Sequence, residues 1–123
     1  MTTPADAVAR RLRERDELIR QVRRWSNGLD AALKVRDVVV FGSVARGDFH
    51  AASDVDVLVV ALCLPDHPHE RLAALGDYPA RVEPVVWTAA EYAAQLARSN
   101  PIALEVQHDG VWLLGEPPLG NRG

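Results

Sequence analysis

Residues 38–60 read VVVFGSVARGDFHAASDVDVLVV, and this stretch determines the fold of the chain. Its first apolar run is rich in β-branched residues, which favours a buried strand, and it ends in the pair Gly42 and Ser43. Such a pair most often makes an ordinary turn. Here a loop closed by Arg46 and Gly47 and a second apolar run follow it, and glycine lets the backbone approach a phosphate closely. The stretch therefore predicts a phosphate-binding turn between two strands, with a short helix over 44–49.

Asp54 and Asp56 stand at the start of the second apolar run. Side chains alternate along a strand, so the two carboxylates project from the same face. Two like charges between apolar runs are costly unless a cation neutralises them. Two carboxylates beside a phosphate cradle therefore predict a divalent-metal site for phosphoryl chemistry. The alternative is that Asp54 lies in solvent as part of an Asx turn and that Asp56 pairs with Arg46, which could equally bind a phosphate.

The composition is that of one globular domain, which we expect to span residues 1–123. A net charge of −3 excludes the strong basic bias of a dedicated duplex-binding protein. The single cysteine, Cys63, excludes an internal disulfide and is expected to be a small buried apolar residue. No apolar run approaches the ~18 residues of a membrane span, and the first residues lack the apolar stretch that a leader would have, so we expect none. We therefore expect a cytoplasmic protein that has no membrane partner.

The order of expected elements predicts an α/β (α+β) domain in which a small mixed sheet is flanked by helices. A helical region over 1–33 begins at Thr3 and Pro4 and reaches a stop signal at Asn27 and Gly28, after which another turn is expected. A catalytic core over 34–114 and a frayed tail over 115–123 follow. The expected strands are 34–41, 54–62, 81–87 and 111–114, and the expected later helices are 68–75, 88–98 and 102–107. Pro84 cannot donate to a ladder, which predicts an edge position or a bulge for the third strand.

Seven of the fourteen basic residues lie between Arg10 and Arg24, mixed with acidic residues. This pattern is typical of a solvated helix face with ion pairs between successive turns. The alternative is a basic surface that binds an acidic partner or an RNA.

The segment GSVARGDFHAASDVD resembles the G-S-x-A-R-G…S-D-x-D signature of minimal nucleotidyltransferases of the DNA polymerase β superfamily. Both halves of the signature are complete, and the resemblance covers essentially the whole chain. It implies a polymerase-β-like nucleotidyltransferase fold, with Asp54 and Asp56 as ligands of two Mg²⁺ ions. The resemblance also implies that the glycine–serine pair holds the β- and γ-phosphates of a nucleoside triphosphate. The nucleotide-binding residues expected on this basis are Gly42, Ser43, Arg46, Gly47 and Ser53.

The resembling family has a third carboxylate, commonly Asp, on a neighbouring strand. Glu83 is the candidate here, because it lies on the third expected strand just before that strand's apolar run. Its extra methylene would let it reach the same metal from a slightly withdrawn backbone. The alternative for Glu83 is an exposed acid on an edge strand, and the substitute candidates are then Asp77 and Glu91.

The resemblance also implies a reaction and a partner. In that family, stand-alone domains are often paired with a separately encoded, all-helical toxin of the HEPN class, to which they add AMP as antitoxins. It thus implies Mg²⁺-dependent transfer of a nucleoside monophosphate, AMP from ATP, to a hydroxyl of a partner protein. The first alternative is a catalytically silent module that binds or neutralises a partner protein. The second is nucleotidyl transfer to a small molecule or to an RNA end.

Overall fold

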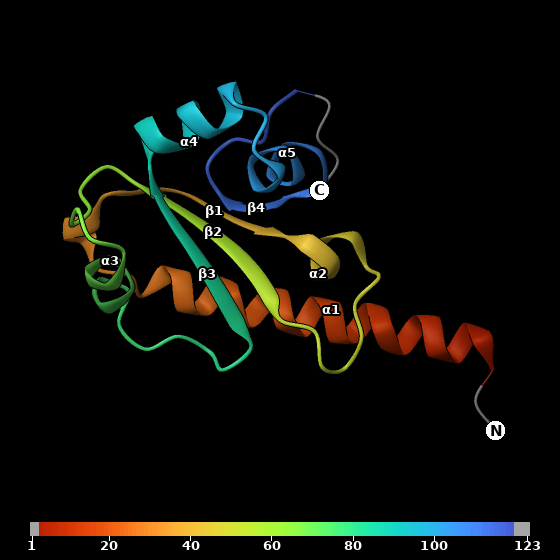
Figure 1. The fold of residues 1–123 in the computed structure, drawn as a ribbon. Coiled ribbons are helices and arrows are strands. Elements are labelled where there is room, and N and C mark those ends of the chain that lie inside the picture. The colour runs from red at the N-terminus through yellow and green to blue at the C-terminus, as the bar shows by residue number, and fades with distance from the viewer. Residues whose placement is uncertain (1–2, 120–123) are drawn as a thin grey trace.

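The computed structural model of the protein describes residues 3–119. One four-stranded sheet, in the order β3-β2-β1-β4, lies between a long helix on one face and two shorter helices on the other (Figure 1). β1 (Val35–Phe41) pairs antiparallel with β2 (Val55–Ala61) and with β4 (Val111–Leu114). β3 (Val82–Thr88) runs parallel to β2. The predicted small mixed sheet flanked by helices is therefore confirmed.

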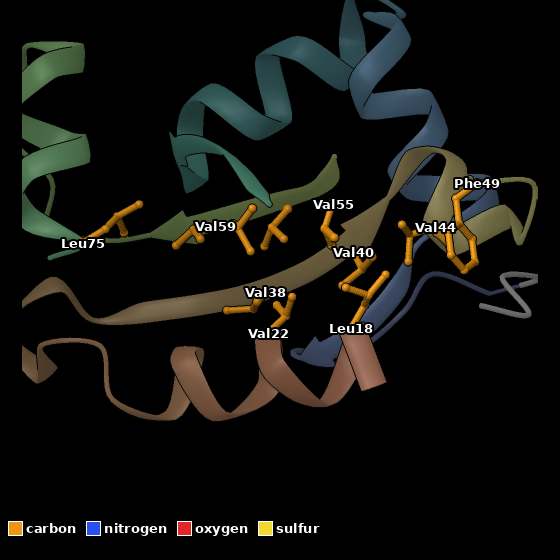
Figure 2. Packing of buried hydrophobic residues seen from close by; sticks show 12 residues of the cluster. Leu18, Val22, Val38, Val40, Val44, Phe49, Val55, Val59 and Leu75 are labelled. Atoms are coloured by element: carbon orange, nitrogen blue, oxygen red, sulfur yellow. The ribbon is translucent and has the colours of Figure 1, made fainter. Parts of the chain in front are cut away.

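The long helix α1 (Pro4–Asn27) covers one face of the sheet. Its two buried residues, Leu18 and Val22, lie four positions apart and pack in one cluster with Val38 and Val40 of β1 (Figure 2). The helix begins with a capping box between Thr3 and Asp6 and ends before Gly28, as the sequence predicts. A short 3-10 helix (Ala31–Leu33) then leads into β1.

The helices α4 (Ala89–Ala97) and α5 (Pro101–Asp109) cover the opposite face of the sheet (Figure 1). The buried residues of this second cluster are Val39, Phe41, Leu58, Val60, Tyr92, Ala103 and Val106. Residues of β2 thus alternate between the two faces, with Val57 and Val59 on the α1 side. The same alternation places Asp56 on the face that α4 and α5 cover, which fixes the side of the sheet on which a site can form.

The helix after β1 differs from the expected range 44–49. The helix α2 (Gly42–Arg46) begins directly after the strand, at Gly42. Gly47 ends it with a left-handed backbone (φ 86°). Phe49 lies beyond the helix and is 1% exposed in the cluster on the α1 side (Figure 2). The aromatic side chain therefore packs in the hydrophobic core, although its backbone belongs to the loop that leads to β2.

The prediction that Cys63 is buried is wrong, because the side chain is exposed. β2 ends at Ala61, and the N–H group of Cys63 donates a hydrogen bond to the carbonyl of Leu33 beyond the sheet. The chain then turns away toward α3 (Pro68–Ala74). The cysteine thus lies in the connection between β2 and α3, where a run of apolar residues does not indicate that each side chain is buried.

Of the two possibilities predicted for the third strand, an edge position or a bulge, the structure shows the edge position. β3 pairs only with β2 in the described sheet, and Pro84 lies opposite Val57 with no break in the register. Proline is tolerated there because an edge strand needs ladder donors on one side only. After β4, residues 115–119 form no helix or strand, while the rest of the predicted tail, 120–123, lies outside the described residues. Within 3–119, no helix is long and apolar enough to cross a membrane.

The capping box at the start of α4 should make stability depend on pH. The N–H group of Thr88 and the Arg71 guanidinium both donate to the Glu91 carboxylate, at 2.7 and 2.6 Å. Burial alone would raise the pKa of Glu91, but these hydrogen bonds lower it below its ordinary value. The carboxylate therefore stabilises the fold fully above the unfolded-state pKa, about 4.3, and this stabilisation is lost as the pH falls through the lower folded-state pKa.

We expect Glu91→Gln to reduce the free energy of unfolding at neutral pH by up to about 1 kcal/mol, since the carboxylate is partly exposed. The difference between the wild type and the variant should shrink as both are acidified below the ordinary glutamate pKa. Urea denaturation at neutral and acidic pH measures it. Glu70→Gln, at an exposed position of α3, controls for the loss of one charge. A difference that does not change with pH would contradict the assignment.

Candidate active site

Three carboxylates, those of Asp54, Asp56 and Glu83, lie near one end of the sheet. In the parallel ladder, Asp56 of β2 lies directly opposite Glu83 of β3, and on its other side it pairs with Phe41 of β1. Asp54 is exposed just before β2, while Asp56 is half-buried and Glu83 is exposed. The sequence placed Asp54 inside the strand, but the ladder begins at Val55. The structure thus brings together the carboxylates of adjacent strands that the sequence singled out.

Gly42 brings the turn after β1 against the Asp56 carboxylate. Its backbone is left-handed (φ 75°), and a Cβ atom added there would collide with Asp56 Oδ2. Only glycine combines this conformation with so close an approach. Ser43 follows at the next position of α2 and is partly exposed. The predicted phosphate-binding turn therefore lies directly against Asp56, one of the predicted metal ligands.

The Asp56 carboxylate lies in a field of like charges. Burial raises the pKa of Asp56 above its ordinary value, and the nearby carboxylates of Asp54, Glu105 and Glu83 raise it further. The Arg46 guanidinium opposes part of this effect. Burial and three neighbouring carboxylates destabilise the charged form of Asp56, and a bound cation would remove this destabilisation.

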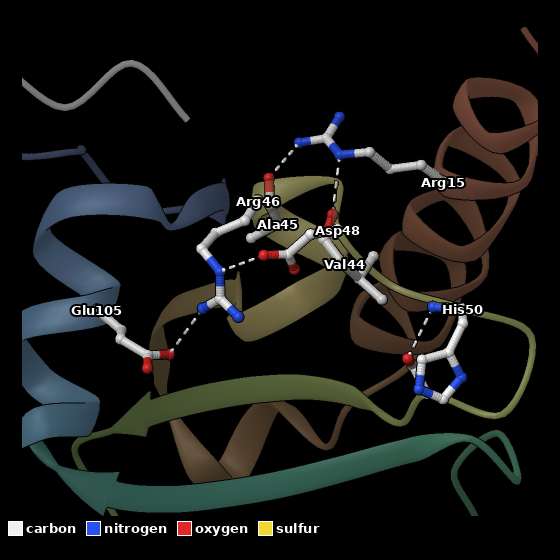
Figure 3. Close-up of polar contacts among 8 residues, drawn as sticks. Arg15, Val44, Ala45, Arg46, Asp48, His50 and Glu105 are labelled. Atoms are coloured by element: carbon white, nitrogen blue, oxygen red, sulfur yellow. Dashed lines mark hydrogen bonds and ion pairs between the residues drawn. The ribbon is translucent and has the colours of Figure 1, made fainter. Parts of the chain in front are cut away.

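Arg46, at the end of α2, pairs with carboxylates other than that of Asp56. Its Nε atom donates to Asp48 Oδ2 at 3.2 Å, and its Nη1 atom lies 3.6 Å from Glu105 Oε2 (Figure 3). The alternative in which Arg46 pairs with Asp56 is therefore not what the structure shows: Arg46 pairs with Asp48 and Glu105 instead. Sequence reasoning missed Glu105, because α5 is far from the signature in the chain and no local pattern marks it.

Arg15 of α1 holds α2 in place, and sequence reasoning missed it as well. Its Nε and Nη2 atoms donate to the carbonyls of Val44 and Ala45, both at 2.9 Å (Figure 3). The last carbonyls of a helix have no intrahelical partner, so an arginine from another element can satisfy them. The basic stripe on α1 thus includes one residue that fastens the phosphate-binding turn.

Ser53 and Arg81 shape the turn that leads into the metal ligands. The Ser53 hydroxyl accepts a hydrogen bond from the N–H group of His50 at 2.9 Å, which closes the turn. The Ser53 carbonyl accepts two bonds from the Arg81 guanidinium, at 3.1 and 2.7 Å. Next to it, the N–H group of Val55 donates to the Arg81 carbonyl at 2.7 Å. The Ser53 side chain thus stabilises the turn before Asp54 through a backbone hydrogen bond, and Arg81 holds that turn against the start of β3.

We expect Arg81→Ala to lower the free energy of unfolding by about 1.5 kcal/mol, because two hydrogen bonds from a charged donor are lost at a partly buried carbonyl. Arg81→Lys should recover part of this loss, since lysine offers a point charge without the forked geometry. Chemical denaturation measures both. Arg13→Ala on the exposed face of α1 is the control and should stay within ~0.5 kcal/mol of the wild type. Equal effects of Arg81→Ala and the control would contradict the fastening role.

The two substitute candidates for the third carboxylate lie elsewhere. Glu91 follows the far end of β3, where Thr88 pairs with Ala61, and its carboxylate is bound by Thr88 and Arg71. Asp77 lies in the exposed connection between α3 and β3. Of the three candidates, Glu83 is the one aligned with Asp56. Trp87 of β3 stacks on Tyr92 of α4.

The carboxylates of Asp54, Asp56 and Glu83 could supply some of the ligands of a Mg²⁺ ion. Within residues 3–119, no three His, Cys, Asp or Glu side chains converge closely enough to form a complete metal site. Magnesium in nucleotide sites is held by one or two carboxylates plus phosphate oxygens and water, so an open set of this kind is what it requires. The close approach of Gly42 to Asp56 would place phosphate oxygens beside these carboxylates. The residues present therefore fit a metal–nucleotide complex.

Comparisons with known proteins agree with this architecture. A family model described as nucleotidyltransferase domain matches residues 16–92. A protein from Sulfolobus solfataricus, described as a nucleotidyltransferase, is 18% identical with a TM-score of 0.62, over 83% of this chain and 84% of that one. A toxin–antitoxin structure with AMP-PNP is 24% identical with a TM-score of 0.46, over 83% of this chain and 73% of that one. No curated protein matches the chain. The family model spans more than half of the sequence, so the chain belongs to the nucleotidyltransferase domain family of the polymerase β superfamily.

Proposed function

We propose that the protein catalyses Mg²⁺-dependent transfer of a nucleoside monophosphate, AMP from ATP, to a hydroxyl group. The observation that carries the proposal is the contact between the turn at Gly42 and the carboxylate of Asp56, with Glu83 aligned on the next strand. A phosphate-binding turn against paired carboxylates suits phosphoryl chemistry on a metal-bound triphosphate. Family membership supports a nucleotidyl group as the group transferred.

The proposed roles follow from where each residue lies. Asp54, Asp56 and Glu83 would hold two Mg²⁺ ions, which when bound polarise the phosphate oxygens and neutralise the charge that develops during displacement. The backbone of Gly42 and Ser43 binds the triphosphate through N–H groups, and the Ser43 hydroxyl adds a further donor. The remaining nucleotide-binding residues of the proposal are Arg46, which offers a guanidinium to phosphate, and Gly47 and Ser53, which shape the two ends of the loop.

Transfer breaks the bond between the α-phosphorus and its bridging oxygen to the β-phosphate, and it forms an ester between that phosphorus and the acceptor oxygen. Glu83 is exposed at the edge strand, so an acceptor can reach it. It accepts the proton of the acceptor hydroxyl as general base. The turn at Gly42 and Ser43 keeps the β- and γ-phosphates in place while they leave as pyrophosphate.

The proposed acceptor is a hydroxyl of a partner protein, specifically a separately encoded HEPN-like helical toxin, which would make this protein its antitoxin. An exposed apolar pair on the first half of α1 supports a protein partner. Val8 and Leu12 are 60% and 56% exposed at a spacing of four residues, so both lie on one side of the helix. The groove beside them, which includes Arg11 and Arg15, reaches Gly47 at the end of the phosphate-binding turn.

The test uses the protein with Mg²⁺ and ATP labelled at either the α- or the γ-phosphate, in the presence of the protein encoded by the adjacent gene. Transfer of a nucleoside monophosphate predicts covalent labelling of that protein from α-labelled ATP only. Labelling from γ-labelled ATP would indicate phosphoryl transfer and contradict the proposal. A tight complex that carries no label under any condition would instead favour the catalytically silent binding module. Labelling of an RNA end or a small molecule, without any protein acceptor, would reassign the acceptor class.

A further inference from the structure

We infer that Glu105 of α5 holds Arg46 away from the triphosphate in the nucleotide-free protein and releases it when the nucleotide binds. Glu105 thereby sets the affinity for the metal–nucleotide complex as a positioning residue. The inference rests on the proposed function, because it assigns a role at the same site.

The geometry around Arg46 distinguishes its two acidic partners. The Nε–Asp48 contact is 3.2 Å and meets hydrogen-bond criteria, whereas the Nη1–Glu105 contact is 3.6 Å and is an ion pair only (Figure 3). The side chains of Arg46 and Glu105 are 39% and 43% exposed. A partly exposed ion pair of this length contributes little free energy, so a stronger anion can replace it.

The elements that carry the two acids respond differently to a movement of Arg46. Asp48 is two residues away on the same segment and can move with it. Glu105 belongs to α5, whose residues Ala103 and Val106 are fully buried against the sheet. The backbone at Glu105 is therefore fixed, and its side chain alone cannot follow far. When the Arg46 guanidinium turns toward a phosphate, the pair with Glu105 is the one that breaks.

A bound triphosphate is the stronger partner for this guanidinium. Arg46 lies three residues after Ser43, within one helical turn of the phosphate-binding pair. A guanidinium can bind phosphate oxygens through two parallel hydrogen bonds, and these charge-assisted bonds are stronger than a single ion pair at 3.6 Å. The Arg46–Glu105 ion pair therefore has to break before the Arg46 guanidinium can bind the phosphates, and this lowers the affinity for the nucleotide.

The experiment is a double-mutant cycle on nucleotide affinity, which needs no acceptor. The dissociation constant of AMP-PNP with Mg²⁺ is measured by titration calorimetry for the wild type, Glu105→Gln, Arg46→Gln and the double variant. We expect Glu105→Gln to bind about two- to fivefold more tightly, the range that a partly exposed ion pair gives. In the Arg46→Gln background the same change at Glu105 should have no effect. Glu70→Gln, which removes one charge on α3, is the control and should match the wild type.

Each other outcome overturns the inference. Glu105→Gln with unchanged or weaker affinity would mean that the pair does not compete with the nucleotide. An equal gain in the Arg46→Gln background would mean that Glu105 acts by direct repulsion of the phosphates and does not position Arg46. If Glu105→Gln is poorly folded, Glu105→Ala gives the same comparison, because alanine is favourable in a helix. A wild type that binds no nucleotide in Mg²⁺ would contradict the proposed function itself, and that result needs no variant of Glu105.

Discussion

Asp56→Asn is expected to reduce nucleotidyl transfer by about a thousandfold or more. Asparagine keeps the shape of the side chain but removes the charge that would bind metal between Gly42 and Glu83. Electrostatic stabilisation by a metal contributes several kcal/mol to such a displacement, and about 1.4 kcal/mol corresponds to a factor of ten in rate. The measurement is the rate of label transfer from α-labelled ATP at saturating Mg²⁺. Retention of a tenth or more of the wild-type rate would contradict the assigned role.

The same variant should fold at least as well as the wild type in the absence of metal. Burial and neighbouring carboxylates raise the pKa of Asp56, so its charged form destabilises the metal-free protein at neutral pH. Removing the charge relieves that repulsion, and thermal unfolding in EDTA should show no decrease in Tm. The matched control is Asp66→Asn, an exposed aspartate in the connection after β2, which should keep full transfer activity. Together these results would separate a functional loss from a folding defect.

Gly42→Ala is expected to cause the second large loss, in both stability and transfer. Alanine at φ 75° costs about 1–2 kcal/mol in backbone conformation alone. Its methyl group would also collide with the Asp56 carboxylate, so the turn or the aspartate must move. A displacement of about 1 Å among reacting groups can cost roughly a hundredfold in rate. We expect a loss of about 3 kcal/mol in the free energy of unfolding, together with transfer reduced at least a hundredfold.

Gly76→Ala is the matched control for that variant. Gly76 has nearly the same backbone conformation (φ 68°), but a Cβ atom there would meet nothing within 4 Å. It should therefore show only the conformational cost of about 1–2 kcal/mol and normal transfer activity. Chemical denaturation and the transfer assay measure both variants side by side. If Gly42→Ala is no worse than Gly76→Ala, the close approach between the turn and Asp56 has no functional importance.

The parts of the fold that follow local rules could be predicted from the sequence. The start signal at Thr3 and Pro4 predicted where α1 begins, and the helix expected from residue 88 agrees with α4, which begins at Ala89. Proline without an N–H group predicted the edge position of β3. In each of these cases the physical cause lies within a few residues of its effect.

The parts that were missed depend on contacts between distant segments. Glu105 and Arg15 reach the signature loop from α5 and α1, and nothing in their neighbouring residues marks them. Arg81 binds the turn before Asp54 across 28 positions of the chain. The exposure of Cys63 was missed for a related reason, because the apolar run continues past the last paired residue of β2. The sequence thus predicted the carboxylates of the candidate site but not the arginines that hold the surrounding backbone.

The most direct test of the proposed metal site is paramagnetic NMR line broadening by Mn²⁺, which binds oxygen ligands as Mg²⁺ does. The measurement follows backbone amide signals of the protein with AMP-PNP as Mn²⁺ is added in substoichiometric amounts. If Asp54, Asp56 and Glu83 hold the metal, broadening should be selective for residues 42–43, 54–56 and 83, at the end of the sheet where Phe41, Asp56 and Glu83 are aligned. Signals of Arg36 and Thr88, at the opposite end of the sheet, should stay sharp. Broadening centred on that opposite end, or no broadening near Asp56, would contradict a metal site at Asp54, Asp56 and Glu83.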